Sequence, residues 1–258
     1  MPEGDTIAYA ARRMRPVLEG VVPDEIRTPQ ERHRVDRWPQ RLAGRAVNEI
    51  RTHGKHLFLV FEGDLLIHSH LRMTGSWAVY PDGARWRRSP RRAWLILRSR
   101  GHHVVQFDGP VLELLTEGRA RFDQRLAGLG PDVLAPEFDF DRFLARLRTD
   151  DQTRAIADAL LDQRNVAGIG NAWKSEGCWA AEIDPWRRVS AVTDAEAVAI
   201  IEAIRPRMSR TAQLGPLEDE PRVFRRNERP CPRCATKILS RRQGDDNRTT
   251  FWCPGCQL

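Results

Sequence analysis

Four of the five cysteines in the chain form two pairs with the spacing Cys-x-x-Cys. The pairs are Cys231–Cys234 and Cys253–Cys256, and 18 residues separate them. Four thiolates at this spacing are typical of a tetrahedral, structural zinc site that is closed to substrate. Two disulfides, or a redox-active pair, are the alternatives, but an intracellular chain and the repetition of the pair favour zinc. We predict one structural zinc ion that stabilises a module too small to bury a core of its own.

The segment between the two cysteine pairs, residues 241–252, predicts a strand, a turn and a second strand. The turn places Arg248 at or near its tip, where an arginine can enter a duplex groove and bind a phosphate. A solvated arginine without a ligand is the alternative. The fifth cysteine, Cys178, lies among apolar residues of an expected helix, and we expect it in the core.

A glycine-rich turn, residues 166–170, separates two expected helices. Gly168 and Gly170 allow unusual backbone angles and leave amides that a phosphate can approach. We expect Asn171 to be the N-cap of the second helix, whose amides and dipole favour an anion. A helix–turn–helix hairpin without any ligand has the same pattern.

The elements that must position these residues change character along the chain. Apolar residues at helical spacing predict a helix over 5–20, and a capping box at Thr193–Glu196 opens the last helix. Turn signals between β-rich segments predict an antiparallel sandwich or barrel. The expected strands are 57–61, 65–70, 94–97, 104–107 and 111–115, and the expected later helices are 139–148, 152–162, 171–182 and 194–210.

These elements predict an α+β multidomain fold. We expect an N-terminal domain of a helix and a β-sandwich (1–127), a linker (128–136), a helical domain (137–221) and a zinc-finger β-hairpin (222–258).

The composition of the 258-residue chain is 41% hydrophobic and 30% charged, which excludes a disordered tail, a collagen and a coiled coil. The net charge is +7, and 39 of the 42 basic residues are arginine, which suits bidentate phosphate contacts. Basic residues gather in 85–107 and in 222–258, and these two runs favour a nucleic-acid partner. No apolar run approaches the roughly 18 residues of a membrane span, and no signal peptide is evident, so we expect an intracellular protein with no membrane partner.

Five motifs in order along the chain resemble the Fpg/Nei family of DNA glycosylases with AP lyase activity. Together they extend from residue 2 to residue 257, and the first and last of them resemble the endonuclease VIII (Nei) branch. The motifs are PEGDT at 2–6, GKH at 54–56, GLGPDVL at 128–134, LDQ and AGIGN within 161–171, and RTTFWCPGCQ at 248–257.

The resemblance implies that 1–127 is the catalytic domain and that 137–221 is a helix-two-turn-helix DNA-binding domain. It also implies a catalytic role for Pro2, Glu3 and Lys55. Removal of Met1 exposes the secondary amine of Pro2, and an α-amine has a pKa of about 8, far below that of a lysine. This amine is the nucleophile that forms a Schiff base at the sugar, Glu3 moves protons, and Lys55 contacts the flanking phosphate. Without the other four motifs, a helix start would be the preferred interpretation of Pro2-Glu3.

The resemblance also implies DNA contacts. Asn171 and Arg248 hold the backbone, with Gly168 and Gly170 in the turn, and Arg72 and Met73 fill the gap left by the extruded base. The Asp-Pro-Arg-Arg-Phe-Gly motif of the Fpg branch is absent, and the loop 215–221 is short for a lid over a purine. Both departures favour oxidised pyrimidines as the bases that are removed, and the resemblance implies that the strand is then cleaved by β,δ-elimination.

Two alternatives stay open, namely the same chemistry on oxidised purines and a catalytically silent zinc-finger protein that binds lesions. We expect damaged double-stranded DNA as the partner of a monomer in the bacterial cytoplasm.

Overall fold

The computed structural model describes residues 2–215, 219–244 and 247–257. The chain divides into two units. The first contains Pro2 and Thr6–Ala127, and the second contains Glu3–Asp5 and the chain from Gly128 onward. Three N-terminal residues therefore belong to a unit whose other members begin more than a hundred positions later.

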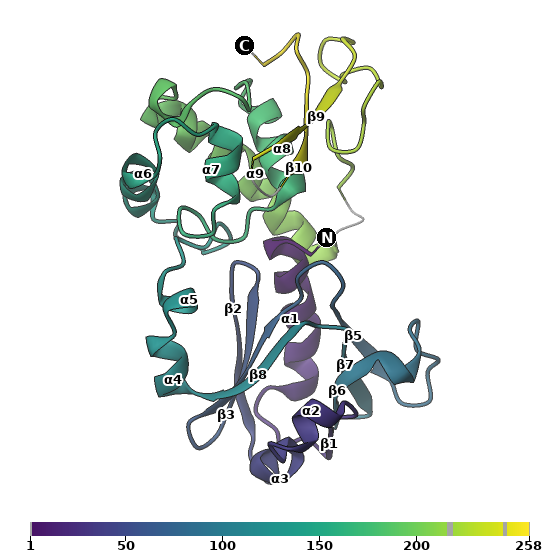
Figure 1. Ribbon diagram of the computed structural model, residues 1–258. Helices are drawn as coiled ribbons and strands as arrows, with labels where there is room; N and C mark the ends of the chain where they lie inside the picture. The colour runs from purple at the N-terminus through teal and green to yellow at the C-terminus, as the bar shows by residue number, and fades with distance from the viewer. Residues whose placement is uncertain (1, 216–218, 245–246, 258) are drawn as a thin grey trace. The chain divides into compact units, whose positions relative to one another are not determined.

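Two antiparallel sheets form the first unit. Within the described residues their strand orders are β2-β3-β4-β8 and β1-β6-β7-β5 (Figure 1). The strands are β1 (Glu25–Arg27), β2 (Val47–His53), β3 (His56–Phe61), β4 (Leu65–His70), β5 (Ser76–Pro81), β6 (Ala93–Ser99), β7 (His102–Phe107) and β8 (Val111–Thr116).

Helix α1 (Gly4–Leu18) packs into the core that the two sheets share. Its apolar residues recur every three or four positions, so one face is apolar, and Ile7, Met14 and Leu18 are fully buried there. Leu57 and Leu97 supply the same core from the two sheets. The short helices are α2 (Glu31–Arg34), α3 (Trp38–Leu42), α4 (Glu117–Phe122) and α5 (Gln124–Ala127), with a 3₁₀ turn at Pro90–Arg92.

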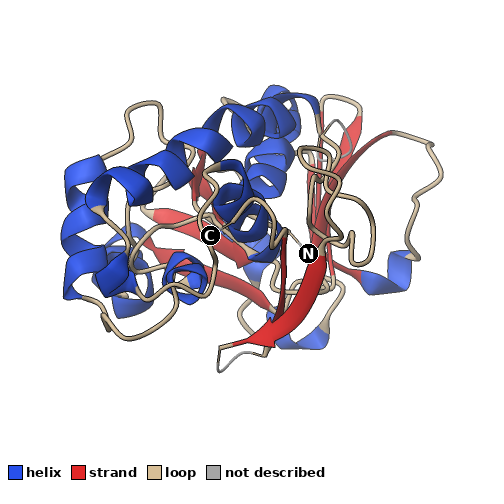
Figure 2. Cartoon of the chain, turned by 90° about the horizontal axis from the view of Figure 1, so that it is seen from above, coloured by secondary structure: helices blue, strands red, loops and turns tan. Residues whose placement is uncertain are grey.

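Helices dominate the second unit, and a two-stranded hairpin follows them; Figure 2 shows helices in blue and strands in red. Phe143, Leu160 and Ile204 are fully buried in one helical core. Cys178 lies in the same core, as expected, where burial raises the pKa of its thiol to about 12. The elements are α6 (Phe140–Thr149), α7 (Ile156–Leu161), α8 (Asn171–Ala180), a 3₁₀ turn (Val189–Ala191), α9 (Asp194–Leu214), β9 (Leu239–Gln243) and β10 (Arg248–Trp252).

The structure confirms the predicted α+β class, with its helix, β-sandwich and helical part, and it also departs from the sequence prediction. Strands β1, β2 and β5 and the four short helices were not predicted, because brief or partly polar segments carry weak periodicity. The capping box is confirmed, since Thr193 N donates to Glu196 Oε2 at 2.7 Å and Glu196 N donates to Thr193 Oγ1 at 3.2 Å. Helix α9 continues to Leu214 with Pro206 inside it, four residues beyond the prediction.

The short loop predicted at 215–221 includes residues 216–218, which lie outside the described residues, as does Met1. Among the described residues, no helix is long and apolar enough to cross a membrane.

Candidate active site

Glu3 occupies the N-terminus of α8. Its side chain is buried at 4% exposure, and Gly170 N donates to Oε2 at 2.9 Å while Ala172 N donates to Oε1 at 2.9 Å. Trp173 N adds a longer contact of 3.3 Å to Oε2. The first amides of a helix have no partner within it and favour negative charge. The anion predicted at this helix start is therefore the chain's own Glu3.

The glycines of the turn make room for this arrangement. Gly168 has φ +105°, a region that glycine tolerates best, and its carbonyl accepts a hydrogen bond from Gly4 N at 2.9 Å. A Cβ on Gly170 would lie 2.3 Å from Cδ of Glu3. Gly168 thus binds the backbone of Gly4, and Gly170 leaves space for the side chain of Glu3.

Asp5 fixes the same segment at a second point. Its buried carboxylate accepts a hydrogen bond from Thr211 Oγ1 of α9 at 2.8 Å. We call Glu3–Asp5 the N-terminal strap, because three successive residues are bound to the second unit. Pro2, which is half-buried, is joined to the strap by one peptide bond.

Asn171 connects α8 to the hairpin. The N-cap of α8 is Gly170, so the prediction of Asn171 as N-cap is wrong by one residue. Asn171 is buried, and its Nδ2 donates to the carbonyl of Thr249 at 2.8 Å. Within the described residues, its Oδ1 has no hydrogen-bond partner.

Arg248 lies beside the turn of the hairpin, near the tip as predicted. It is the first residue of β10, opposite Gln243, and it is half-buried, unlike the solvated arginine of the alternative. It lines an open cavity of about 740 Å³ together with residues of α7 and of the turn that follows. The lining comprises Asp151, Arg154, Asp158, Leu161, Asp162, Gln163, Arg164, Gly244 and Arg248.

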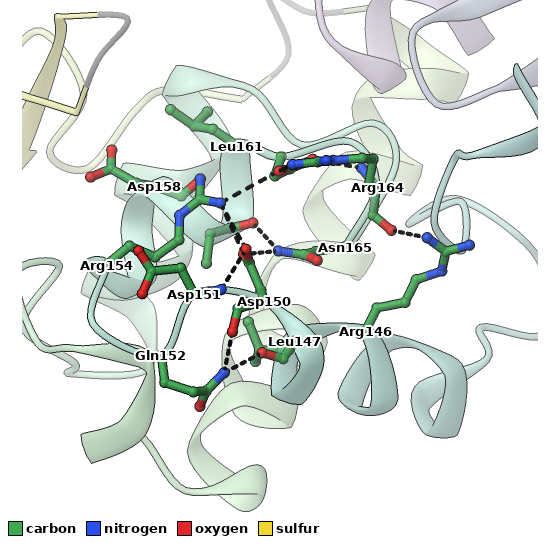
Figure 3. A network of polar contacts seen from close by, with 12 residues as sticks. Arg146, Leu147, Asp150, Asp151, Gln152, Arg154, Asp158, Leu161, Arg164 and Asn165 are labelled. Atoms are coloured by element: carbon green, nitrogen blue, oxygen red, sulfur yellow. Dashed lines mark hydrogen bonds and ion pairs between the residues drawn. The ribbon is translucent and has the colours of Figure 1, made fainter. Parts of the chain in front are cut away.

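A polar network braces the turn between α7 and α8 (Figure 3). Asp150 accepts hydrogen bonds from Arg154 Nη1 at 2.9 Å and from Asn165 Nδ2 at 2.6 Å. Arg164 binds Asp162 at 2.6 Å, and this hydrogen bond lowers the pKa of Asp162 to about 2. Residues 162–165, which lead into the glycine turn, are therefore held by these hydrogen bonds and ion pairs.

Lys174 lies one turn along from Asn171 in α8, the helix that packs against β10 of the hairpin. It is fully buried, and its Nζ has no hydrogen-bond partner within the described part of the chain. Burial lowers the pKa of Lys174 to about 8, and the charge of Arg248 lowers it further while Asp158 opposes the shift.

The residues of the first unit that are expected to contact DNA, Lys55, Arg72 and Met73, lie on two neighbouring turns. Lys55 is half-buried in the two-residue turn between β2 and β3, which begins with Gly54 at φ +54°. Arg72 and Met73 are exposed in the turn between β4 and β5, and Met73 is 58% exposed. Arg72 has φ +48°, an uncommon conformation for a residue with a side chain.

The four cysteines of the two pairs come together, with their sulfur atoms all within 4.8 Å of one another. Cys234 Sγ lies 3.4 Å from that of Cys253 and 3.3 Å from that of Cys256, while Cys231 and Cys256 are 3.8 Å apart. Zinc–sulfur bonds of about 2.3 Å in a tetrahedron require sulfur atoms about 3.8 Å apart. The donor set therefore fits a metal ion of this type, and Thr236 lowers the pKa of the Cys234 thiol to about 6.

The structure thus places the predicted residues in two groups. Pro2, Lys55, Arg72 and Met73 lie in the first unit, whereas Glu3, Gly168, Gly170, Asn171, Arg248 and the cysteines lie in the second.

Comparison with known families accounts for both units. Residues 1–165 match the formamidopyrimidine-DNA glycosylase N-terminal domain, and residues 129–216 match the H2TH domain of the same glycosylase. The chain belongs to the Fpg/Nei family. Members of the family are DNA glycosylases with AP lyase activity.

Named relatives place this Fpg/Nei protein close to the endonuclease VIII branch. It is 41% identical to "Probable endonuclease 8 2" of Streptomyces coelicolor, covering 100% of this chain and 94% of the relative. It is 34% identical to "DNA-(apurinic or apyrimidinic site) lyase Nei2" of Mycolicibacterium smegmatis, covering 100% and 99%.

Solved structures of the Fpg/Nei family share the fold. A MutM structure in complex with DNA containing carbocyclic 8-oxo-G has a TM-score of 0.84 at 23% identity, covering 100% of both chains. A complex of Lactococcus lactis Fpg with DNA containing an abasic site has a TM-score of 0.84 at 22% identity, covering 99% of both chains.

Proposed function

We propose that this DNA glycosylase/AP lyase of base excision repair removes oxidised pyrimidines from double-stranded DNA through the amine of Pro2. The anchoring of Glu3, the residue next to Pro2, on the helical unit carries this proposal. Relatives that are named endonuclease 8 and AP lyase over the whole chain support it. We further propose that the protein acts as a monomer in the bacterial cytoplasm.

The reaction starts at an amine that forms when Met1 is removed. The secondary nitrogen of Pro2 attacks C1′ of the damaged nucleoside and the bond from C1′ to the base breaks. The amine loses a proton, and the departing base gains one. The bond from C1′ to the ring oxygen O4′ then breaks, O4′ takes up a proton, and the nitrogen and C1′ form an iminium. The iminium then draws electrons from the sugar, so that the two phosphates leave in successive β- and δ-eliminations.

Glu3 is the group that we assign to proton transfer. Its three amide contacts hold it in place as a carboxylate, which is the form that can accept a proton. In this proposal it first accepts the proton of the attacking amine and then returns a proton to the base. Glu3 directly follows the proposed nucleophile in the sequence, and the contacts of the strap fix the position of its carboxylate.

Phosphate contacts are assigned to Lys55, Asn171 and Arg248. Gly168 and Gly170, whose own amides bind Gln163 and Glu3, shape the turn that leads to Asn171. Arg72 and Met73 fill the space that the extruded base leaves, which suits their exposed turn. One structural zinc ion, bound by Cys231, Cys234, Cys253 and Cys256, holds the hairpin of Arg248 in shape.

Borohydride trapping tests the nucleophile. Reduction of the reaction with a duplex that contains an abasic site should give a covalent adduct, and peptide mass mapping should place it on the Pro2 nitrogen. Mapping to Lys55 would overturn the assignment. Lys174 serves as an internal control, because a fully buried amine should not react.

A matched panel of duplexes tests the substrate. Oxidised pyrimidine and oxidised purine lesions are placed at the same position and compared under single-turnover conditions. Faster excision of the pyrimidine is the expected result, and faster excision of the purine would overturn it. Tight binding of both without base release would indicate the catalytically silent alternative.

A further inference from the structure

Three hydrogen-bonded side chains, His56, His68 and Glu113, cross the sheet of β2, β3, β4 and β8, and we call them the relay. Nδ1 of His56 lies 2.8 Å from Nε2 of His68, and Nδ1 of His68 lies 3.1 Å from Oε2 of Glu113. The side chain of His68 is 2% exposed, whereas that of Glu113 is 34% exposed. The three residues come from β3, β4 and β8, so the relay runs directly across neighbouring strands.

These contacts fix which ring nitrogens carry protons. A carboxylate only accepts, so His68 donates Nδ1–H to Glu113 and presents an unprotonated Nε2. That nitrogen accepts from His56, whose proton is therefore on Nδ1. Burial keeps these rings neutral, because it lowers the pKa of His56 to about 2 and also lowers that of His68.

The His56 end of the relay lies beside the two turns that carry the proposed DNA contacts. His56 directly follows Lys55 and pairs with His70 in the sheet register, with ring centroids 4.7 Å apart. Nδ1 of His70 accepts the backbone N–H of Arg72 at 3.1 Å. One set of contacts therefore extends from Glu113 to the residue after Lys55 and to the backbone of Arg72.

The Glu113 end of the relay is bound to α5, the last helix of the first unit. Arg125 of α5 binds Glu113 at 3.2 Å and Asp123 at 2.6 Å. The Glu113 carboxylate is thus held in place by a cation as well as by His68, and the hydrogen bond from His68 lowers its pKa.

We propose that Glu113 and His68 are positioning residues that orient His56 and, through the His56–His70 contact, hold the turns of Lys55 and Arg72–Met73 in the arrangement that engages DNA. The inference rests on the proposed roles of Lys55 and Met73. Neither Glu113 nor His68 needs to touch the substrate, because their effect passes through His56.

Glu113→Ala removes the terminal acceptor, whereas Glu113→Gln keeps an oxygen that can accept from His68. Two-bond ¹H–¹⁵N spectra of the full-length zinc-loaded protein report the tautomers without DNA. Wild type and Glu113→Gln should show Nδ1–H on His56 and His68 and Nε2–H on His70. Glu113→Ala should lose this pattern and shift the Arg72 amide and the Met73 methyl signals.

The kinetic arm measures the single-turnover rate of trapping on a saturating abasic duplex. Glu113→Ala should lower this rate about ten- to a hundredfold, as misplaced contact groups do. Binding of an undamaged duplex should stay within about twofold, and Glu113→Gln should restore most of the rate. Glu49→Ala is the matched control, since Glu49 is an exposed carboxylate of β2 that pairs with Arg51 at 3.6 Å.

Two results would overturn the proposal. One is an unchanged tautomer pattern in Glu113→Ala, and the other is a changed pattern with a wild-type trapping rate. If wild type itself does not trap, the proposed function fails, while the tautomers and the Arg72 and Met73 signals still decide whether the relay orders the two turns.

Discussion

Gly170 leaves the space that Glu3 fills, since a Cβ at position 170 would lie 2.3 Å from the carboxyl carbon of Glu3. The backbone at Gly170 has φ −122°, which any residue can adopt. The glycine is therefore required by the neighbouring carboxylate and not by its own conformation.

Gly170→Ala should displace Glu3 from the α8 amides. Loss of hydrogen bonds to a buried charged group should lower the free energy of unfolding by about 2–4 kcal/mol. Base release should fall at least about tenfold, because the carboxylate leaves its position beside Pro2. Chemical denaturation and single-turnover excision measure the two effects. Gly118→Ala in α4 is the control, since the nearest atom to its Cβ is 4.0 Å away; an equal loss in that variant would contradict the explanation.

Glu3→Gln tests charge at constant shape. The amide keeps one oxygen acceptor but turns an NH₂ group toward a backbone N–H, so stability should fall by about 1–3 kcal/mol. Base release should be abolished, while duplex affinity should stay within a few-fold because no phosphate contact is lost. Excision at the wild-type rate would exclude Glu3 from proton transfer.

Arg248→Ala should weaken binding of a lesion duplex and reduce the slope of log affinity against log salt by about one phosphate contact. Because Arg248 is half-buried, its loss should also cost a modest amount of stability, about 1 kcal/mol. Fluorescence anisotropy across a salt series measures the slope. Arg242→Ala, an exposed residue of the same hairpin opposite Thr249, is the comparison. Equal slopes for both variants would mean that Arg248 contributes only general charge.

Cys253→Ser should release the metal and unfold the hairpin. With three thiolates left, the tetrahedral site is incomplete, so zinc content should fall from one per chain toward zero and duplex binding should be lost. Atomic absorption and binding on the same preparation test this. A variant that loses zinc but binds DNA like wild type would separate the metal from recognition.

Lys174→Met should change how stability depends on pH. The pKa of Lys174 is lowered to about 8 in the folded chain, from 10.5 ordinarily, so the unfolded chain binds more protons between these values. Wild-type stability should therefore gain from this lysine as pH rises from 8 toward 10.5, and lose that contribution as pH falls. Methionine has a similar shape and no charge, so it should raise stability at pH 7 and remove this part of the pH dependence. Melting temperatures of both proteins at pH 7, 8, 9 and 10 provide the test, and parallel curves would contradict it.

Local sequence signals predicted much of this fold. The spacing of Ile7, Met14 and Leu18 predicted α1, and the Thr193–Glu196 pair marked the start of α9. The cysteine spacing likewise predicted a cluster that the structure brings together. Each signal lies within one segment, so no tertiary information was needed.

The remaining features depend on partners far apart in the sequence. Nothing near Glu3 indicates that its carboxylate binds amides 167 to 170 positions later. The relay needs the register of three strands to bring His56, His68 and Glu113 together. The cavity that Arg248 lines together with Asp158 and its neighbours was not predicted, because local sequence does not reveal which distant residues meet there.

The N-terminal strap also sets an order for biosynthesis. Asp5 binds Thr211, which is made 206 residues later, so the strap has no complete docking site until most of the chain has left the ribosome. At bacterial-scale synthesis rates this delay is roughly 10 to 40 seconds. During that interval the start of the chain is open to the peptidase that the proposed chemistry requires. The proposed nucleophile would thus be exposed early, and the Glu3 carboxylate reaches its binding site on α8 only when the second unit folds.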